Sequence, residues 1–310
     1  MPEFYLIPKR LARKSPKLSS IARSAEAFTF RAIFWLIRRM SVQNALRLSA
    51  FTFGLVGPLS DKASKARENL AIAFPDKSDR WRQHTTREIF KHLGRSAAEL
   101  IKLDQIWEER DQRIELVFEP GAREHMASKR ATVYLTAHVG AWQVATLVTR
   151  EFGIDISTIY APESNPIMSE VMMGLRRSFG DHLIPNDAGP RPLIQTLKNG
   201  GSVVIAMDTR PDTGKLIPFF GRDALTSTSP AGLALRTHSA LVVARAERLP
   251  GAKYRITVCT PLRSPIPDAS VKEQSVALTT MVHEYFEAWI REYPEQWICL
   301  KRRWPKAHKL

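Results

Sequence analysis

Cysteine is scarce in this sequence, which contains only Cys259 and Cys299 among 310 residues. The two lie far apart and form no C-x-x-C pair, so a disulfide-stabilised scaffold is excluded and a reducing compartment is indicated. We expect both thiols to be small buried apolar groups.

Long hydrophobic runs are also missing. The longest uncharged stretch of the N-terminal region covers residues 48–60 and contains Gly54, Gly57 and Pro58. A membrane-spanning helix needs about 20 apolar residues. The basic N-terminus is not followed by an apolar segment with a small-residue cleavage site. The sequence therefore predicts neither a cleaved signal peptide nor a clear transmembrane helix.

Internal repeats and low-complexity runs are absent as well. The length and the 44% hydrophobic content suit one sizeable domain with a small extension. We predict a basic, apolar N-terminal arm at residues 1–60 and one folded unit at residues 61–310.

Acidic residues are few at both ends of the chain, although the whole sequence carries 31 of them against 46 lysines and arginines, for a net charge of +15. Residues 1–40 contain Glu3 and Glu26 as their acids. Their basic residues are Lys9, Arg10, Arg13, Lys14, Lys17, Arg23, Arg31, Arg38 and Arg39. Residues 301–309 have five basic residues and no acid. Such a charge favours anionic partners: nucleic acid, acidic lipid or an acidic protein.

Nucleic acid is the least favoured of these partners. The sequence has no zinc-ligand spacing, no RNA-binding aromatic motif and no clear helix-turn-helix. Residues 28–40 instead interleave aromatic and aliphatic side chains with Arg31, Arg38 and Arg39. This mixture is typical of a helix in a membrane interface, which would place an anionic membrane surface among the partners. An ordinary amphipathic helix packed on the domain is the alternative.

Beyond the arm, helical and strand patterns alternate. A helix with helical apolar spacing is predicted from Ser78 or Asp79 to Lys102. Strands are predicted at 131–137, 155–160, 201–208, 240–247 and 253–260, with helices at 140–153, 169–179, 190–198, 230–238 and 276–292. The pattern predicts an α/β fold with a largely parallel central sheet flanked by helices on both faces, preceded by the helical arm, which we expect to associate with a membrane.

Two strand ends carry chemically useful side chains, His138 and Asp208. Carboxyl ends of parallel strands share one edge of a sheet, where the chemistry of such folds is found. The positive end of a helix starting at Gly140 would favour a neutral imidazole. A neutral imidazole can act as a general base, although a structural histidine is the alternative.

Five segments resemble, in order, those of the bacterial lipid A late-acyltransferase family. HVGAWQ (138–143) is similar to the family's motif of a His, four residues and an acid, with the Gly and Trp142 typical of lauroyl and myristoyl transferases. The other four are ARENLAIAFPD (66–76), IYAPESNPIMSEVMMGLRRSFG (159–180), MDTRPDTGKLIPFFGRDALTSTSPAGLAL (207–235) and PEQWICLKRRW (294–304).

The resemblance implies acyl transfer from a thioester to a hydroxyl group, with no cofactor or metal. His138 would deprotonate the acceptor, and Asp208 matches the family's aspartate. The other implied site residues are Gln143 in the catalytic motif and Trp142, Arg176 or Arg177, Phe219, Phe220, Arg302 and Arg303 in substrate binding. For the two phenylalanines, core packing is an equal alternative; for the arginines, a solvated role is the alternative.

Departures from the family pattern bear on activity. Gln143 stands where the family has Asp or Glu, and an amide can orient an imidazole but cannot stabilise its cation by charge. In a serine protease triad, exchange of the orienting carboxylate for its amide costs about 10⁴ in rate. Ala161 replaces a usual arginine, and Cys299 and Lys301 replace a usual Trp and His.

Residues 61–310 are accordingly interpreted as an acyltransferase domain. The implied donor is a thioester of acyl carrier protein, favoured over coenzyme A, and the implied acceptor is a lipid A precursor at the cytoplasmic face of the bacterial inner membrane. Two alternatives stay open: another membrane lipid as acceptor, or a catalytically silent lipid-binding relative because of Gln143. We expect Asp208, rather than residue 143, to supply the negative charge beside His138.

Overall fold

The computed structural model describes residues 16–160, 169–170, 173–174 and 182–305. A central sheet of seven strands has the order β1-β9-β8-β2-β5-β3-β4. The strands are β1 (Ile114–Phe118), β2 (Thr132–Thr136), β3 (Ile156–Tyr160), β4 (His182–Pro185), β5 (Ser202–Ala206), β8 (Ala240–Leu249) and β9 (Lys253–Val258). All neighbours are parallel except β8 and β9, which form an antiparallel hairpin. The predicted α/β class with a largely parallel sheet is confirmed.

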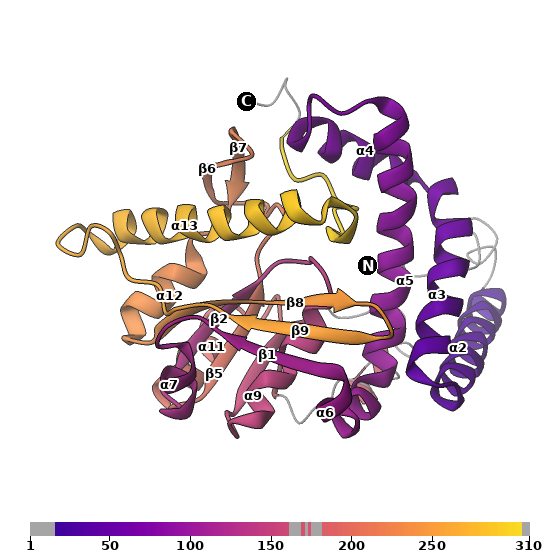
Figure 1. Ribbon diagram of the computed structural model, residues 1–310, viewed down its shortest axis with the longest axis horizontal. Coiled ribbons are helices and arrows are strands. Elements are labelled where there is room, and N and C mark those ends of the chain that lie inside the picture. Colours follow the sequence, from indigo (N-terminus) through magenta and orange to yellow (C-terminus); the bar gives the residue numbers. More distant parts are fainter. Residues whose placement is uncertain (1–15, 161–168, 171–172, 175–181, 306–310) are drawn as a thin grey trace.

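Both faces of the sheet are covered because its central strands are apolar on both sides. The five residues of β2 are all buried. Val133 and Leu135 pack into one core with α12 (Ser229–Thr237) and α13 (Val271–Glu292), whereas Tyr134 packs into a second core on the opposite face. This alternation is what a fully covered strand requires. Figure 1 shows α13 above the sheet and α7 (Ala122–Ala127) and α9 (Leu147–Glu151) below it.

One end of the sheet is flanked by a stack of helices. These are α5 (Asp79–Glu108), α3 (Val42–Val56) and α2 (Pro16–Arg39), which lie side by side in Figure 1. The Ser78 side chain caps α5, as the sequence predicted, by accepting a hydrogen bond from the Trp81 N–H. Other helices of the described residues are α4 (Asp61–Ala73), α6 (Arg110–Arg113), α8 (Trp142–Ala145) and α11 (Arg191–Lys198), with short 3₁₀ turns η1 (Gly57–Leu59) and η2 (Pro294–Gln296).

The N-terminal arm is partly packed and partly exposed. Ala27 and Ile37 of α2 are buried, while Phe28, Trp35 and Leu36 are exposed. In α3, Val42, Ala45 and Leu46 are buried in the second core, so this helix shares the packing of the main fold. No helix within the described ranges is long and apolar enough to cross a bilayer. The division of the chain at residue 60 stays a prediction.

The predicted helix at 140–153 is wrong in its start and its continuity. Gly140 has a left-handed backbone (φ +62°), and a Cβ there would lie 2.1 Å from the Ala246 carbonyl oxygen. The chain therefore pairs with β8 before α8 begins at Trp142, and it breaks again before α9 begins at Leu147. The elements β1, β4, α7 and the hairpin of β6 (Lys215–Phe219) and β7 (Arg222–Thr226) were not predicted. Most of the helix predicted at 169–179 lies outside the described residues.

A buried amide fastens the C-terminal segment, residues 296–304, to α4. Asn69 of α4 is fully buried, and its Nδ2 donates to the carbonyl oxygens of Cys299 (2.8 Å) and Lys301 (2.7 Å). Its Oδ1 accepts from the Arg303 N–H at 3.0 Å. One side chain thus satisfies three backbone groups of a segment without regular structure.

We expect Asn69→Ala to lower the free energy of unfolding by about 2–4 kcal/mol, because three buried backbone groups lose their partner. The measurement is urea unfolding of the purified full-length chain. Asn44→Ala, at an exposed position of α3, is the matched control and should change stability by less than about 0.5 kcal/mol. Equal effects of the two substitutions would contradict this account of Asn69.

Candidate active site

The strand register brings His138 and Asp208 together. Thr136 of β2 pairs with Ala206 of β5, so the residues two positions further along each chain leave the sheet at the same edge. Asp208 Oδ1 lies 2.7 Å from His138 Nδ1 and accepts the His138 backbone N–H at 3.0 Å. The expected juxtaposition of these two side chains is therefore present.

The Asp208 carboxylate is held by a third donor. Its Oδ2 accepts the Trp297 indole N–H at 3.1 Å, and Trp297 is 1% exposed. The segment that carries Trp297 runs beside residues 138–140. The Ile298 N–H donates to the His138 carbonyl oxygen at 2.8 Å, and the Gly140 N–H donates to the Gln296 carbonyl oxygen at 3.2 Å. The C-terminal segment thus fixes both members of the pair.

Burial and ion pairing act in opposite directions on this pair. Burial alone lowers the pKa of His138, but the charge of Asp208 and its hydrogen bond outweigh it, and the pKa lies above 6.5; Lys301 opposes the rise. For Asp208, burial alone raises the pKa, yet the charge and hydrogen bonds of His138 and the Trp297 N–H lower it overall. The expectation that a helix end favours a neutral imidazole is wrong, because α8 is a four-residue turn and the carboxylate dominates.

The side chain of His138 remains partly exposed. Its side chain is 31% exposed, whereas that of Asp208 is 2% exposed. With Nδ1 turned to the carboxylate, Nε2 is the nitrogen that can accept a proton from a bound hydroxyl group. Trp142 lies edge-on to the imidazole, with ring centroids 5.2 Å apart. Its indole ring therefore packs against the imidazole ring.

Gln143 does not take part in this hydrogen-bonded arrangement. Its Oε1 is shielded from solvent and has no hydrogen-bond partner, and no bond joins it to His138 within the described part of the chain. Asp208, the residue expected to supply the negative charge beside His138, also makes the orienting contact on Nδ1, which an amide at position 143 could have made. The catalytic role assigned to Gln143 stays a prediction.

The other predicted site residues fall into two groups. Arg176 and Arg177 lie outside the described residues. Phe219 and Phe220 are buried in the core and pack around Trp297, with ring centroids 6.1 and 6.2 Å from it. Both phenylalanines thus support the tryptophan that holds Asp208, which agrees with the core-packing alternative. Their substrate-binding role stays a prediction.

The two C-terminal arginines make internal contacts. Arg302 pairs with Glu68 at 2.6 Å and holds the pKa of that carboxyl at about 2. Arg303 is 1% exposed and donates to the Leu225 carbonyl oxygen (2.8 Å) and the Thr226 hydroxyl (2.7 Å). Burial lowers its pKa to about 10. A phosphate contact by Arg303 would require this side chain to leave the core, and the substrate-binding roles of both arginines stay predictions.

Sequence reasoning missed Trp297 and Asn69. Both lie in segments that the resemblance had singled out, ARENLAIAFPD and PEQWICLKRRW. The available signal was the presence of an amide and a tryptophan in those segments, but nothing in the linear sequence joins positions separated by 230 residues. No group of three or more His, Cys, Asp or Glu side chains that could hold a metal ion occurs among the described residues.

The His138–Asp208 pair gives the activity a defined pH dependence. Because Asp208 raises the pKa of His138 above 6.5, we expect kcat/KM to fall as the pH drops through a value above 6.5, where the imidazole becomes protonated and loses its lone pair. Asp208→Asn should move this limb to lower pH, since the opposing effects of burial and Lys301 then prevail. If kcat/KM of the wild type falls only below pH 6.5, the proposed effect of Asp208 on the pKa of His138 is contradicted.

Comparisons with known proteins find relatives of nearly the whole chain. The family model "Bacterial lipid A biosynthesis acyltransferase" matches residues 12–306. The chain is 25% identical to the lipid A biosynthesis myristoyltransferase of Escherichia coli (strain K12) over 254 residues, 79% of this chain and 77% of that protein. It is 24% identical to lipid A biosynthesis acyltransferase 2 of Shigella flexneri over 250 residues, 78% of each chain.

Among solved structures, a match is the 1-acyl-sn-glycerophosphate acyltransferase PlsC of Thermotoga maritima. Its TM-score is 0.38 at 14% identity, with 80% of this chain and 97% of that chain covered. The family model spans nearly the whole sequence and includes both members of the His138–Asp208 pair. This chain belongs to the bacterial lipid A biosynthesis acyltransferase family, and it is an acyltransferase.

Proposed function

We propose that the protein transfers a fatty acyl chain from a thioester donor to a hydroxyl group of a lipid A precursor at the cytoplasmic face of the bacterial inner membrane. The observation that carries the proposal is the 2.7 Å contact between His138 Nδ1 and Asp208 Oδ1, which leaves Nε2 of a partly exposed imidazole available. The family membership supports the class of acceptor.

The reaction follows from that geometry. Nε2 of His138 takes the proton of the acceptor hydroxyl as its oxygen attacks the thioester carbonyl carbon. The imidazolium that forms is stabilised by the Asp208 carboxylate, which keeps its own charge. The C–S bond then breaks, and the leaving thiolate receives the proton from Nε2. The new ester and the free thiol are the products, and His138 returns to its neutral form.

The test is direct. The full-length protein is incubated with acyl carrier protein thioesters and a tetra-acylated lipid A precursor, and the products are read by mass spectrometry. A mass increase of one acyl chain, absent with His138→Ala, is expected. Parallel reactions with coenzyme A thioesters and with lysophospholipid acceptors identify the donor carrier and the acceptor class. Transfer to the lysophospholipid alone would reassign the acceptor.

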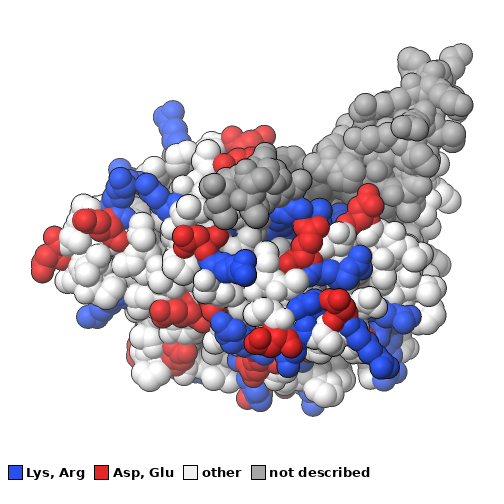
Figure 2. Space-filling view, turned by 90° about the horizontal axis from the view of Figure 1, so that it is seen from above, with Lys and Arg blue, Asp and Glu red and all other residues white. Residues whose placement is uncertain are grey.

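Acyl carrier protein is the proposed donor carrier because acidic carriers complement a chain of net charge +15. On the face seen in Figure 2, Lys and Arg side chains are interspersed with Asp and Glu side chains, so no single contiguous basic patch is visible there. We expect the transfer rate with the carrier-bound donor to fall several-fold between low and moderate ionic strength, because salt screens attraction between exposed charges. A matched coenzyme A reaction controls for effects of salt on the chemistry, and an unchanged rate with the carrier would contradict the proposal.

A further inference from the structure

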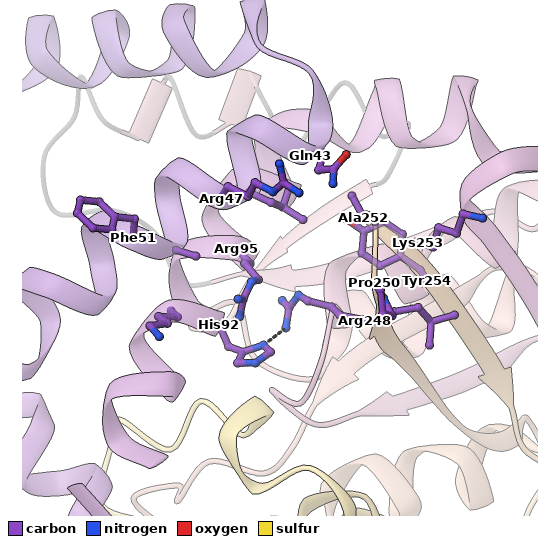
Figure 3. A pocket seen from close by; sticks show the side chains of 15 residues that line it. Gln43, Arg47, Phe51, His92, Arg95, Arg248, Pro250, Ala252, Lys253 and Tyr254 are labelled. Carbon is purple, nitrogen blue, oxygen red and sulfur yellow. Dashed lines mark hydrogen bonds between the residues drawn. The ribbon is translucent and has the colours of Figure 1, made fainter. Parts of the chain in front are cut away.

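A cavity of about 580 Å³ lies between α3, α5 and the β8–β9 hairpin. None of its lining residues belongs to the His138 site. Figure 3 shows Arg47 of α3, Arg95 of α5 and Arg248 of β8 together around it. Lys91 and Lys253 also line it. The cavity therefore gathers five cationic side chains from three parts of the fold that are distant in the sequence.

Carboxylates neutralise only part of this charge. Arg248 binds Glu99 through two hydrogen bonds of 2.6 and 2.8 Å, and Lys91 binds Glu88 at 2.6 Å. Five cations less two such carboxylates leave three positive charges at the cavity. Among the described residues, no hydrogen bond or ion pair engages the side chains of Arg47, Arg95 or Lys253, so these three cations are available to a ligand.

The surroundings of Arg95 indicate an anion. Burial lowers the pKa of its guanidinium, and the charge of the neighbouring Arg248 lowers it further, although Glu88 and Glu99 act in the opposite direction. The buried His92 of the same wall has a pKa of about 2, first because of burial and then because of the nearby cations. A neutral histidine and a desolvated arginine without a bonded carboxylate leave the site with an uncompensated positive potential.

An exposed apolar stripe of α3 meets the cavity at Phe51. Phe51 lines the cavity and is 68% exposed, and Leu48 and Leu55 on the same stripe of α3 are 40% and 56% exposed. Leu59 of η1, which follows α3 in the chain, is 85% exposed. Large exposed apolar side chains beside a cationic pocket fit a ligand that joins a charged head group to hydrocarbon chains.

We propose that this cavity binds the phosphate group of a membrane lipid, with the lipid chains along the exposed α3 stripe of Leu48, Phe51 and Leu55. The guanidinium groups of Arg47 and Arg95 bind the phosphate oxygens, because the planar fork of arginine matches a phosphate with paired hydrogen bonds. The site seats the protein on the bilayer independently of acyl transfer, so its failure and the failure of the proposed reaction are separate results.

The experiment measures binding of the full-length protein to vesicles without turnover. Phosphatidylcholine vesicles with and without a minor fraction of phosphatidic acid are titrated by sedimentation. Arg47→Gln with Arg95→Gln should weaken binding to the anionic vesicles by at least about tenfold, since two charge-assisted contacts are lost. The control is Arg191→Gln with Arg222→Gln, the same charge change at exposed positions outside the cavity, which should leave binding within about twofold.

Two further arms separate a built site from general attraction. The double variant Arg47→Lys with Arg95→Lys keeps both positive charges but removes the planar guanidinium groups that can form paired hydrogen bonds with a phosphate. We expect its affinity for the anionic vesicles to fall several-fold. Wild-type affinity in this variant, or in the Gln variant, would overturn the proposal. Inorganic phosphate is titrated by calorimetry against the wild type. Tight binding of inorganic phosphate with no binding to anionic vesicles would assign the cavity to a soluble phosphate and overturn the lipid assignment.

Discussion

His138→Ala is expected to lower kcat/KM by about 10³-fold or more while leaving the fold intact. The imidazole is the group beside Asp208 that is open to a bound acceptor, with 31% of its side chain exposed. Without it the hydroxyl oxygen must attack the thioester while still protonated, which removes the general-base contribution and the paired charge in the transition state. The measurement is steady-state transfer from a thioester donor, followed by product mass.

The control for this substitution is thermal unfolding. His138 contributes one side-chain hydrogen bond, to an Asp208 that keeps the His138 N–H and the Trp297 N–H as donors. We expect a modest change in the unfolding midpoint. Residual transfer within about tenfold of the wild type, in a folded variant, would remove His138 from the chemistry and return it to a structural role.

Asp208→Asn is expected to cost about 10² to 10⁴ in kcat, far more than Gln143→Ala. The amide has one acceptor oxygen where the carboxylate has two, so its NH₂ group must face either the Trp297 N–H or the imidazole N–H. The positive charge on His138 in the transition state also loses its counter-ion. The upper end of this range is the loss of about 10⁴ that the same exchange causes at the orienting carboxylate of a serine protease.

A second substitution separates these two causes. Trp297→Phe removes the indole donor at Oδ2, so Asp208→Asn with Trp297→Phe relieves the clash between two donors but does not restore the charge. We expect activity to stay low in the double variant. Recovery to within about tenfold of Trp297→Phe alone would mean that the carboxylate acts by geometry rather than by charge.

The matched comparison is at Gln143, whose Oε1 has no hydrogen-bond partner among the described residues. Gln143→Ala and Gln143→Glu should each stay within about tenfold of the wild type, since neither changes a contact of His138. If Gln143→Ala abolishes transfer while Asp208→Asn is harmless, the assignment of the charge to Asp208 is wrong. If Gln143→Glu raises a nearly inactive parent by orders of magnitude, the silent-relative hypothesis holds.

The sequence predicted those features that depend on local pattern. Residues 132–136 and 202–206 form short, mainly apolar runs, so the sequence predicts that both are strands. Parallel pairing of these strands places their carboxyl ends at one edge of the sheet, and the approach of His138 to Asp208 follows from that. The late start of the helix predicted at 140–153 could not be predicted from the sequence. It arises because Gly140 pairs with Ala246, a residue about a hundred positions away.

The supporting residues of the site escaped prediction for the same reason. Arg303 resembles a solvated C-terminal arginine in the sequence, and only the fold shows that β7 supplies a carbonyl and a hydroxyl group to bury it. The role of Trp297 depends on a carboxylate 89 positions earlier. Periodicity describes the near neighbours of a residue and carries no information about such distant partners.

The contacts of Asn69 have a consequence for synthesis of the protein. The catalytic pair depends on Trp297, and the segment carrying Trp297 is fastened to α4 across 230 residues. At a translation rate of about 5–20 residues per second, β2 and β5, which lead into His138 and Asp208, leave the ribosome several seconds before residue 304 is made. The nascent chain can form much of its sheet in that interval, but Asp208 Oδ2 still lacks the Trp297 indole donor. We therefore expect a chain terminated before Trp297 to transfer acyl groups more slowly than the full chain, because its Asp208 carboxylate lacks one of its donors.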